Sequence, residues 1–351
     1  MSQDIRPLVS ILIPAYNARA WIADTIRSAL SQSWTNREII VVDDGSRDDT
    51  IEVARRFATD GVSVVAEMHR GAASARNKAF SLSRGDYIQW LDADDLLAPD
   101  KIARQLSSLN GNYNPRILLS SPWARFAYRT ERAKTIATSL WQDLAPAEWL
   151  FRKMGQNLFM QTGTWLTSRE LTKAAGPWDA RLLTDDDGEF FCRILLQCEM
   201  VRFVPGGGVL YRDVHLGGVS FIGTSNDKMD AMLLSMQLHI KYLMSLEDSP
   251  RTRKACLDYM QHWLNLVPPR RRDIVEELYA MAGRLGGSLR APHLRWKYTW
   301  MRPIVGHQAA WHAQLILPHF KARLLSEWDR LMRKSKAGSG KLEDTPISGK
   351  E

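Results

Sequence analysis

Apolar runs and amphipathic stretches alternate along the first hundred residues. In the amphipathic stretches apolar residues recur three and four positions apart, which predicts helices over 20–30, over a short segment capped by Ser46, and over 71–82. The apolar runs between them predict strands over 9–13, 38–42, 62–66 and 87–91. Strands and helices that alternate at this spacing predict an α/β fold, doubly wound, with a mostly parallel sheet and helices on both of its faces.

The pattern loosens after residue 106 and becomes helical after residue 226. Residues 116–121 and 124–130 have the composition of strands and are compatible with an antiparallel pair, and further elements follow at 145–154, 189–196 and 201–204. We therefore expect three parts: an α/β domain over 1–225, a mainly helical region over 226–333, and a tail over 334–351. The Ser, Gly, Lys, Glu and Pro content of that tail is typical of disorder.

Acidic residues gather where two of the predicted strands end. Asp43 and Asp44 follow the second strand, and Asp92, Asp94 and Asp95 follow the fourth. In open parallel sheets ligands bind beyond the carboxyl ends of the strands. Carboxylates two residues apart on a bend suit Mg²⁺ or Mn²⁺, which would neutralise a diphosphate, whereas a polar surface turn is the simpler alternative. The buried flanks of the second cluster favour the metal site.

Three further segments carry candidate chemistry. Residues 69–77 open a helix with small side chains and Arg76, which suits an anion, although a helix packed through its alanines would look alike. Asp185, Asp186, Asp187 and Glu189 crowd together, which suits a general base as well as helix capping. Arg212 or His215 could reach a diphosphate or its metal, although a lone histidine is often structural. The glycines at 206–208 do not form the Gly-x-Gly-x-x-Gly pattern of a nicotinamide site.

Charge is distributed unevenly over the 351 residues. The formal net charge is +8, but residues 251–341 hold 18 basic and 6 acidic residues, and five tryptophans lie between 263 and 328. Such a stretch is compatible with peripheral contact with an anionic membrane, and equally with a solvated helical subdomain whose tryptophans fill its core. No nucleic-acid-binding motif accompanies the charge, so we expect no nucleic acid partner.

Cysteine content and hydropathy predict a cytoplasmic protein, with the inner face of the membrane as a further expectation. Three cysteines are too few for a disulfide framework, and their spacing forms no zinc motif. Residues 1–7 are polar, so no secretory signal is expected, and no run of about 18 uncharged apolar residues predicts a membrane span.

Four sequence blocks together resemble family 2 glycosyltransferases of the GT-A fold, and the resemblance covers roughly residues 7–225. They are Val9-Ser-Ile-Leu-Ile-Pro-Ala-Tyr-Asn17, Val42-Asp-Asp-Gly-Ser-Arg-Asp-Asp-Thr50, Gly71-Ala-Ala-Ser-Ala-Arg-Asn77 and Asp86-Tyr-Ile-Gln-Trp-Leu-Asp-Ala-Asp-Asp95. The resemblance implies inverting transfer of a sugar from a nucleotide diphospho-sugar, commonly a UDP-sugar, to a hydroxyl of a glycan or a lipid-linked acceptor, with a divalent cation, Mn²⁺ or Mg²⁺.

The resemblance also implies roles for individual residues. Asp187 falls on the catalytic base, with Asp186 or Asp185 as alternates because Asp stands at 186 where the family usually has Glu. Trp165 and Asp186 fall where the acceptor binds. The donor side is implied to consist of Pro14, Ala15 and Asn17 in the nucleotide pocket, Asp43 and Asp44 at the base or ribose, Arg76, Asp92 at the ribose and metal, and Asp94 at the metal, which His215 could also reach.

Two other functions are compatible with a doubly wound domain that carries a metal-binding Asp. A sugar-nucleotide nucleotidyltransferase would need a glycine-rich, basic loop directly after the first strand, and Pro14-Ala-Tyr-Asn17 stands there instead. A non-catalytic adaptor would bind the nucleotide sugar without transferring it. Donor hydrolysis and metal-dependent binding of nucleoside diphosphates separate the three.

Overall fold

The computed structural model describes residues 6–213, 225–268, 270–294, 296–306, 309–311, 313, 314, 317 and 327–332. The tail predicted over 334–351 lies outside these residues, as does His215. Within the described parts of the chain, no helix has the length and apolarity that crossing a membrane requires.

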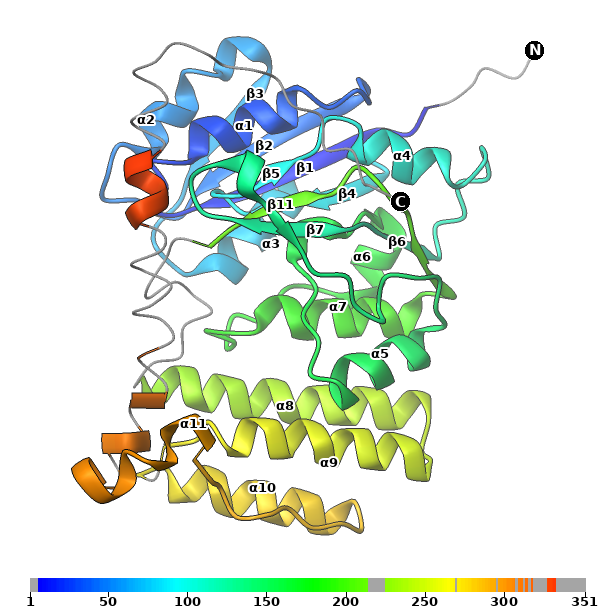
Figure 1. Ribbon diagram of the computed structural model, residues 1–351. Helices are drawn as coiled ribbons and strands as arrows, with labels where there is room; N and C mark the ends of the chain where they lie inside the picture. Colours follow the sequence, from blue (N-terminus) through cyan, green and yellow to red (C-terminus); the bar gives the residue numbers. More distant parts are fainter. Residues whose placement is uncertain are drawn as a thin grey trace.

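A five-stranded sheet forms the centre of the N-terminal half (Figure 1). Its strands are β1 (Val9–Ala15), β2 (Arg37–Asp43), β3 (Val62–Ala66), β4 (Tyr87–Trp90) and β9 (Thr167–Ser168), in the order β3-β2-β1-β4-β9. The first four run parallel, and β9 is antiparallel at the edge. All seven residues of β1 are buried, as expected for a central strand covered on both faces. The doubly wound, mostly parallel sheet is therefore confirmed.

Helices cover both faces of this sheet. Figure 1 shows α1 (Ile22–Leu30) and α2 (Thr50–Arg55) above it and α3 (Ala72–Leu82) below it, followed downward by α7 (Asp186–Gln197). The predicted cap of the second helix is wrong: α2 begins after Asp49, and the Ser46 side chain instead bonds the Asp43 carboxylate. A serine close to a helix start can cap the helix or close a turn, and here the Ser46 side chain closes the turn after β2.

Two smaller sheets extend the domain. β6 (Ile117–Ser120) pairs parallel with β10 (Met200–Phe203), and the second sheet has the order β5-β11-β7-β8. The expectation that the strands near 116–121 and 124–130 pair with each other is wrong. Only two residues separate them, and each finds its parallel partner in the segment 200–212. The strands of the second sheet are β5 (Leu96–Leu97), β7 (Trp123–Phe126), β8 (Lys134–Thr135) and β11 (Val209–Arg212).

The C-terminal region is helical, as predicted, and shares its core with the domain. One cluster of buried apolar side chains includes β-strand residues such as Ile11 and helix residues such as Met236 and Leu278. The remaining helices are α4 (Lys101–Ser107), α5 (Pro146–Gly155), α6 (Arg169–Ala175), α8 (Asn226–Leu246), α9 (Pro250–Leu264), α10 (Arg272–Arg284) and α11 (Trp296–Thr299), with 3-10 turns at Ala58–Asp60, Thr130–Arg132 and Thr162–Thr164.

Candidate active site

The loops that follow β1, β2 and β4 meet at one edge of the sheet. The Asp44 amide donates to the Ala15 carbonyl over 2.8 Å, which joins the ends of β1 and β2. Pro14 and Ala15 are buried there. Asn17 has a left-handed backbone conformation (φ +49°), and its side-chain oxygen accepts from the Arg47 amide over 2.8 Å. This edge is where a doubly wound fold binds its ligands.

The two adjacent aspartates after β2 have different partners. Asp43 is buried and accepts from the Ser46 amide over 3.0 Å, so it shapes its own loop. Asp44 accepts from the amides of Arg70 and Gly71 over 2.8 and 2.9 Å, which fastens the start of α3 to the end of β2. Both carboxylates thus hold the walls of the predicted nucleotide pocket in place.

Tyr16 and His69 form an aromatic shelf beside Asp44. Their rings stack with centroids 4.2 Å apart, and Nδ1 of His69 lies 2.8 Å from Oδ2 of Asp44. Tyr16 is 40% exposed, so part of the stack faces solvent. Gly45 lies against His69: a Cβ added there would come 2.8 Å from the His69 amide nitrogen. The sequence motifs predicted a role for neither ring, although Tyr16 lies within the first family block and His69 stands two residues before the third.

Arg76 joins acidic groups that are far apart in sequence. From α3 its Nη2 donates to Asp92 Oδ1 over 2.9 Å and its Nη1 to Asp186 Oδ2 over 2.5 Å, and its guanidinium lies 4.4 Å from the ring centre of Trp178. Burial opposes the charge, yet Asp186, Asp92 and Asp187 together raise the pKa of Arg76 above its usual value. The second and third acidic segments predicted from the sequence therefore meet in one site.

Asp187 has the environment of a general base. The Thr162 hydroxyl donates to its Oδ2 over 2.9 Å, from the 3-10 turn before Trp165. Burial, and then the negative charge of Asp185, raise the pKa of Asp187, while Arg76 and the Thr162 hydroxyl oppose the rise. A carboxylate with a raised pKa accepts a proton more readily near neutral pH.

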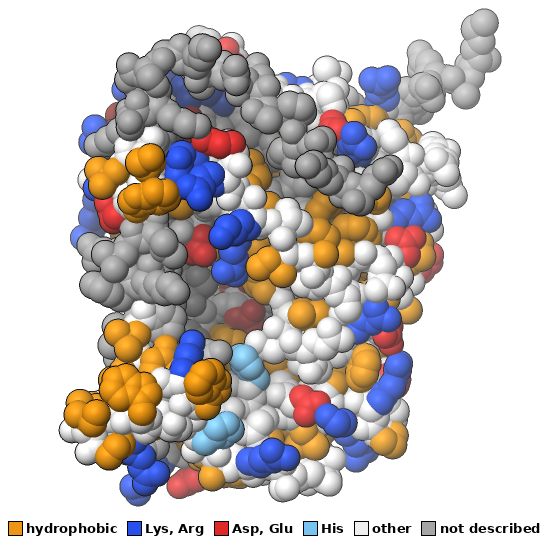
Figure 2. Space-filling view, in the orientation of Figure 1, with side chains coloured by type: hydrophobic (Ala, Val, Ile, Leu, Met, Phe, Trp, Pro, Cys, Tyr) orange, Lys and Arg blue, Asp and Glu red, His pale blue; other side chains and the backbone are white. Residues whose placement is uncertain are grey.

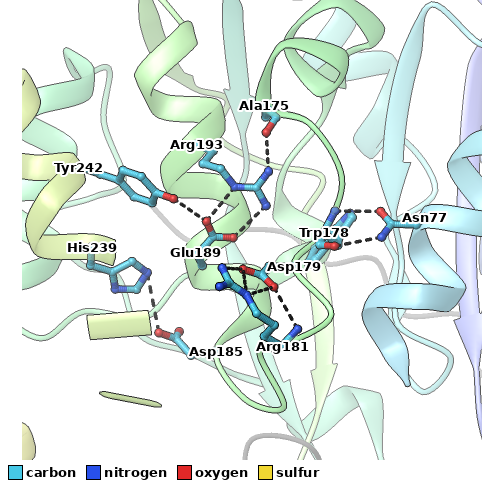
Figure 3. Close-up of polar contacts among 10 residues, drawn as sticks. All are labelled: Asn77, Ala175, Trp178, Asp179, Arg181, Asp185, Glu189, Arg193, His239 and Tyr242. Carbon is cyan, nitrogen blue, oxygen red and sulfur yellow. Dashed lines mark hydrogen bonds and ion pairs between the residues drawn. The ribbon is translucent and has the colours of Figure 1, made fainter. Parts of the chain in front are cut away.

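The neighbouring carboxylates have other partners. Asp186 is only 5% exposed and is paired with Arg76. Asp185, at φ +54°, points toward α8, where the Ser235 hydroxyl donates to it and Nε2 of His239 lies 3.8 Å from its Oδ2 (Figure 3). This division of partners favours Asp187 over its two alternates as the base.

Helix α8 therefore bonds and supports the acidic segment 185–189. Besides the contacts to Asp185, the Tyr242 hydroxyl donates over 2.7 Å to Glu189, which also accepts from Arg193 (Figure 3). His239 is fully buried, and this burial lowers its pKa well below the usual value, so the imidazole is neutral. The C-terminal region thus fixes the start of α7, on which Asp187 stands.

The Asp92–Asp95 loop offers two carboxylates to a cation. Burial raises the pKa of Asp92; Arg76 opposes this rise, and the negative charge of Asp94 adds to it. Asp92 and Asp94 are therefore close enough to interact electrostatically. Asp95 is fully buried and accepts from the Arg212 amide over 2.8 Å, so it anchors the loop from below. Within the described ranges no group of three or more His, Cys, Asp or Glu side chains is placed to hold a metal ion. Hard oxygen donors at Asp92 and Asp94, with water and phosphate oxygens, are what Mn²⁺ or Mg²⁺ accepts, so these residues fit the ion.

Arg212, which the sequence suggested could reach a diphosphate or its metal, acts as a positioning residue. Its Nε donates to the Asp94 carbonyl over 2.7 Å, and its guanidinium lies 4.3 Å from the ring centre of Trp21 and 4.4 Å from that of Phe126. The side chain is 3% exposed. Packed against both rings, the Arg212 guanidinium fixes the backbone of the Asp92–Asp95 loop.

Lys101 supports the segment at residues 163 and 164, a role that the sequence analysis did not predict. Its buried Nζ donates to the side-chain oxygens of Gln89 and Gln105 over 2.6 and 2.7 Å, and the amides of these glutamines donate to the carbonyls of Gly163 and Thr164. Burial lowers the pKa of Lys101 well below its usual value. A glutamine inside an otherwise apolar strand, at position 89, is the sequence signal that could have pointed to this network.

The acceptor role expected of Trp165 is not supported by its position. The side chain is 1% exposed and packs in the core, with ring centroids 5.3 Å from Trp149 and 5.1 Å from Phe191. An indole enclosed in this way has no surface for an acceptor. Thr162, three residues earlier, is the member of this segment that reaches the acidic cluster.

Substituting Thr162 should move the acidic side of the pH–activity profile. A base must be ionised to act, so the rate falls as the pH drops through the pKa of Asp187. Thr162→Val removes a hydrogen bond to the ionised form, so the pKa rises further and the acidic limb of kcat moves to higher pH. Thr164→Val is the matched control, because that hydroxyl donates to the Gln161 carbonyl instead. Identical profiles for the two variants would contradict the bond's role.

Known proteins resemble this chain in sequence over its N-terminal part. Residues 10–175 match the family model described as "Glycosyl transferase family 2". Among curated relatives, a putative teichuronic acid biosynthesis glycosyltransferase, TuaG, of Bacillus subtilis is 43% identical over 104 residues, which is 29% of this chain and 41% of the relative. The glucosyltransferase WfaP of Escherichia coli, named for an acceptor on diphosphoundecaprenol, is 42% identical over 100 residues, or 28% of this chain and 40% of the relative. The chain thus spans less than half the length of these relatives.

Solved structures extend the likeness to nearly the whole chain at the level of the fold. Staphylococcus aureus TarS (residues 1–349, with UDP) matches with a TM-score of 0.61 at 14% identity, covering 92% of this chain and 91% of that one. The mannosyltransferase PcManGT of Pyrobaculum calidifontis, solved with GDP-Man and Mn²⁺, matches with a TM-score of 0.53 at 20% identity, covering 92% and 88%. Residues 10–175 therefore match glycosyltransferase family 2 in sequence, and the described chain has the GT-A fold.

Proposed function

We propose that this protein is an inverting glycosyltransferase that moves a sugar from a nucleotide diphospho-sugar to a hydroxyl of a glycan or glycolipid. The observation that carries the proposal is the Arg76 bridge. It joins Asp92, on the predicted donor side, to Asp186, the neighbour of the predicted base Asp187. A donor and a proton acceptor for the incoming hydroxyl are thereby brought to one edge of the sheet.

The donor pocket lies among the loops after β1, β2 and β4. Pro14, Ala15 and Asn17 would line it, Asp43 and Asp44 would shape it next to the base or ribose, and the exposed part of the Tyr16–His69 stack offers a flat surface to a base. A UDP-sugar is the donor we propose. TarS was solved with UDP and with UDP-GlcNAc, whereas PcManGT was solved with GDP-Man.

The residues that would hold the cation are Asp92 and Asp94. A divalent cation held by these carboxylates would supply positive charge to the departing diphosphate. Arg212 keeps the Asp94 backbone in place, and Asp95 anchors the same loop. These contacts hold the two carboxylates in a fixed arrangement before any donor arrives.

Asp187 would carry out the proton transfer. Its carboxylate accepts the proton of the acceptor hydroxyl while that oxygen attacks the anomeric carbon from the side opposite the diphosphate. The carbon–oxygen bond to the diphosphate breaks as the new glycosidic bond forms, and the configuration inverts. Thr162 orients the carboxylate, and Arg76 holds Asp186 beside it.

We propose a lipid-linked acceptor at the inner face of the membrane. The names of two relatives support this choice, one through teichuronic acid biosynthesis and the other through diphosphoundecaprenol. The net charge of the 251–341 stretch supports it as well, because lipid-linked diphosphates and the inner leaflet are both anionic.

Asp94→Asn should weaken the binding of UDP in the presence of Mn²⁺ by at least about tenfold, because a metal ligand is lost. Calorimetric titration with UDP, with and without Mn²⁺, measures the effect. Asp258→Asn, on the outer surface of α9, is the control and should bind like the wild type. Metal-dependent affinity that is unchanged in Asp94→Asn would refute the metal assignment, and binding without any donor hydrolysis or transfer would favour an adaptor.

A further inference from the structure

Exposed apolar side chains concentrate in the last described part of the chain. Among the described residues, fifteen large hydrophobic side chains are exposed, and eight of them lie between 296 and 332, a stretch in which only 23 residues are described. Trp296, Trp300 and Ile304 are 86%, 63% and 71% exposed. Exposed apolar residues are unremarkable when scattered, whereas a cluster of this kind indicates an interaction surface.

These three residues lie exposed along one short stretch of chain. Trp296 belongs to α11, Trp300 to the turn that follows it, and Ile304 to the helical residues after that turn. Tyr298 and Met301 face inward instead: Tyr298 is buried, and Met301 packs on the small cluster of Leu294, Ala310 and Trp311. The stretch therefore has an inner apolar side that it buries and an outer apolar side that it leaves exposed. Figure 2 shows hydrophobic side chains gathered at the lower left, over α11, with Lys or Arg side chains beside them.

The same stretch lacks negative charge. No Asp or Glu stands between Glu277 and Glu327, while seven Lys and Arg residues do. Lys297 and Arg302, next to the exposed tryptophans, are exposed themselves. A partner must therefore be anionic and must accept apolar side chains. A second copy of this chain fits poorly, because a symmetric contact would place these cations against one another.

The surface lies on the side of the molecule where the site opens. In Figure 1, residues 296–306 and 327–332 lie on the left, as does the carboxyl end of β1. For residues 327–332, contacts agree with this placement. Asp329 accepts from Arg129 Nε over 2.6 Å and from the Tyr128 amide. Tyr128 packs on Trp21, and Trp21 lies over Arg212, which bonds the Asp92–Asp95 loop.

We infer that Trp296, Trp300 and Ile304, with Lys297 and Arg302, form a membrane-docking surface that binds an anionic lipid bilayer. Tryptophan side chains would enter the interface between headgroups and acyl chains, and the cations would contact anionic headgroups. The inference rests on the proposed function for its purpose, which is to bring the site to a lipid-linked acceptor. Docking itself requires no catalysis, so it can be tested apart from transfer.

Sedimentation of the full chain with vesicles tests the inference. With phosphatidylcholine vesicles containing one third phosphatidylglycerol, the wild type should bind at least about tenfold more strongly than with phosphatidylcholine alone. The variant Trp296→Ser/Trp300→Ser/Ile304→Ser should lose about tenfold or more of this binding, because its apolar contact is removed. Lys297→Glu/Arg302→Glu should lose the preference for phosphatidylglycerol.

Two controls separate docking from folding and from catalysis. Ile136→Ser and Tyr279→Ser remove exposed apolar side chains elsewhere and should bind vesicles like the wild type. The thermal shift produced by UDP with Mn²⁺ should be the same in the wild type and in the docking variants, whether or not sugar transfer is ever observed.

Three results would overturn the inference. The first is wild-type protein that stays in the supernatant with both kinds of vesicle. The second is a triple serine variant that binds as well as the wild type. The third is a short RNA that binds the wild type and the serine variant equally but not the charge-reversed variant, which would assign the cations to nucleic acid.

Discussion

Asp187→Asn is expected to abolish sugar transfer, lowering kcat by about 10²–10⁴-fold, which is the range that positioned general bases contribute. The amide keeps the shape of the side chain and can still bond Thr162, but it cannot take the proton of the acceptor hydroxyl. The donor pocket is left intact, so the affinity for UDP with Mn²⁺ should stay near that of the wild type. Turnover is measured as release of UDP in the presence of acceptor.

A comparison within the acidic segment makes this test sharper. Asp186→Asn removes one of the two charged partners of the buried Arg76, so it should lower stability as well as activity, whereas Asp187→Asn should lower activity alone. Urea denaturation of both variants separates the two effects. Full turnover by folded Asp187→Asn would remove Asp187 from the role of base and return attention to Asp185 and Asp186.

Arg76→Met is expected to destabilise the fold by about 3–5 kcal/mol, the cost of leaving buried charges without their partner. The Arg76 side chain is 7% exposed and pairs with Asp92 and Asp186, so solvent cannot replace it. Arg181→Met is the control: its pair with Asp179 is at the surface, and its loss should change stability little. Urea denaturation at neutral pH measures both, and equal effects would contradict the assignment.

The stability lost in Arg76→Met should depend on pH in a defined direction. Burial already raises the pKa values of Asp92 and Asp186, and loss of the guanidinium raises them further. A carboxyl whose pKa is higher in the folded state than in the unfolded state favours folding at low pH, and this contribution is lost as the pH rises through the folded-state pKa. The deficit relative to the wild type should therefore be largest at neutral pH and shrink on acidification.

The order of strands and helices could be predicted because their signals are local. Strands β1 to β4 lie within two residues of the predicted runs, since each run is largely apolar and is followed by Pro or an acidic residue. Pairing between strands was not accessible in the same way. Whether 117–120 joins 123–126 or 200–203 depends on where the chain returns eighty residues later, and the composition of a short strand carries no trace of its partner.

The sequence motifs predicted many of the residues that form the site, but few of the contacts among them. Strand ends and acidic clusters indicated Asp92 and Asp187, and Arg76 connects Asp92 to Asp186, the neighbour of Asp187. The predicted acceptor role of Trp165 does not hold, because a tryptophan suits a core and a sugar-binding surface equally well. Only the packing around the side chain shows which of the two it occupies. Lys101 and Arg212 were missed as supports because a buried cation held by amides or between rings has no fixed spacing in sequence.

The contact between α8 and Asp185 has a practical consequence for anyone who wishes to shorten this protein. A piece that stopped near residue 225 would keep every motif of the glycosyltransferase family, yet it would lose Ser235, His239 and Tyr242, and it would leave the lower side of α7 bare. The smallest working fragment must therefore reach through α8 and the helices packed on it, because the enzyme keeps part of its catalytic framework in a segment that the family's motifs do not mention.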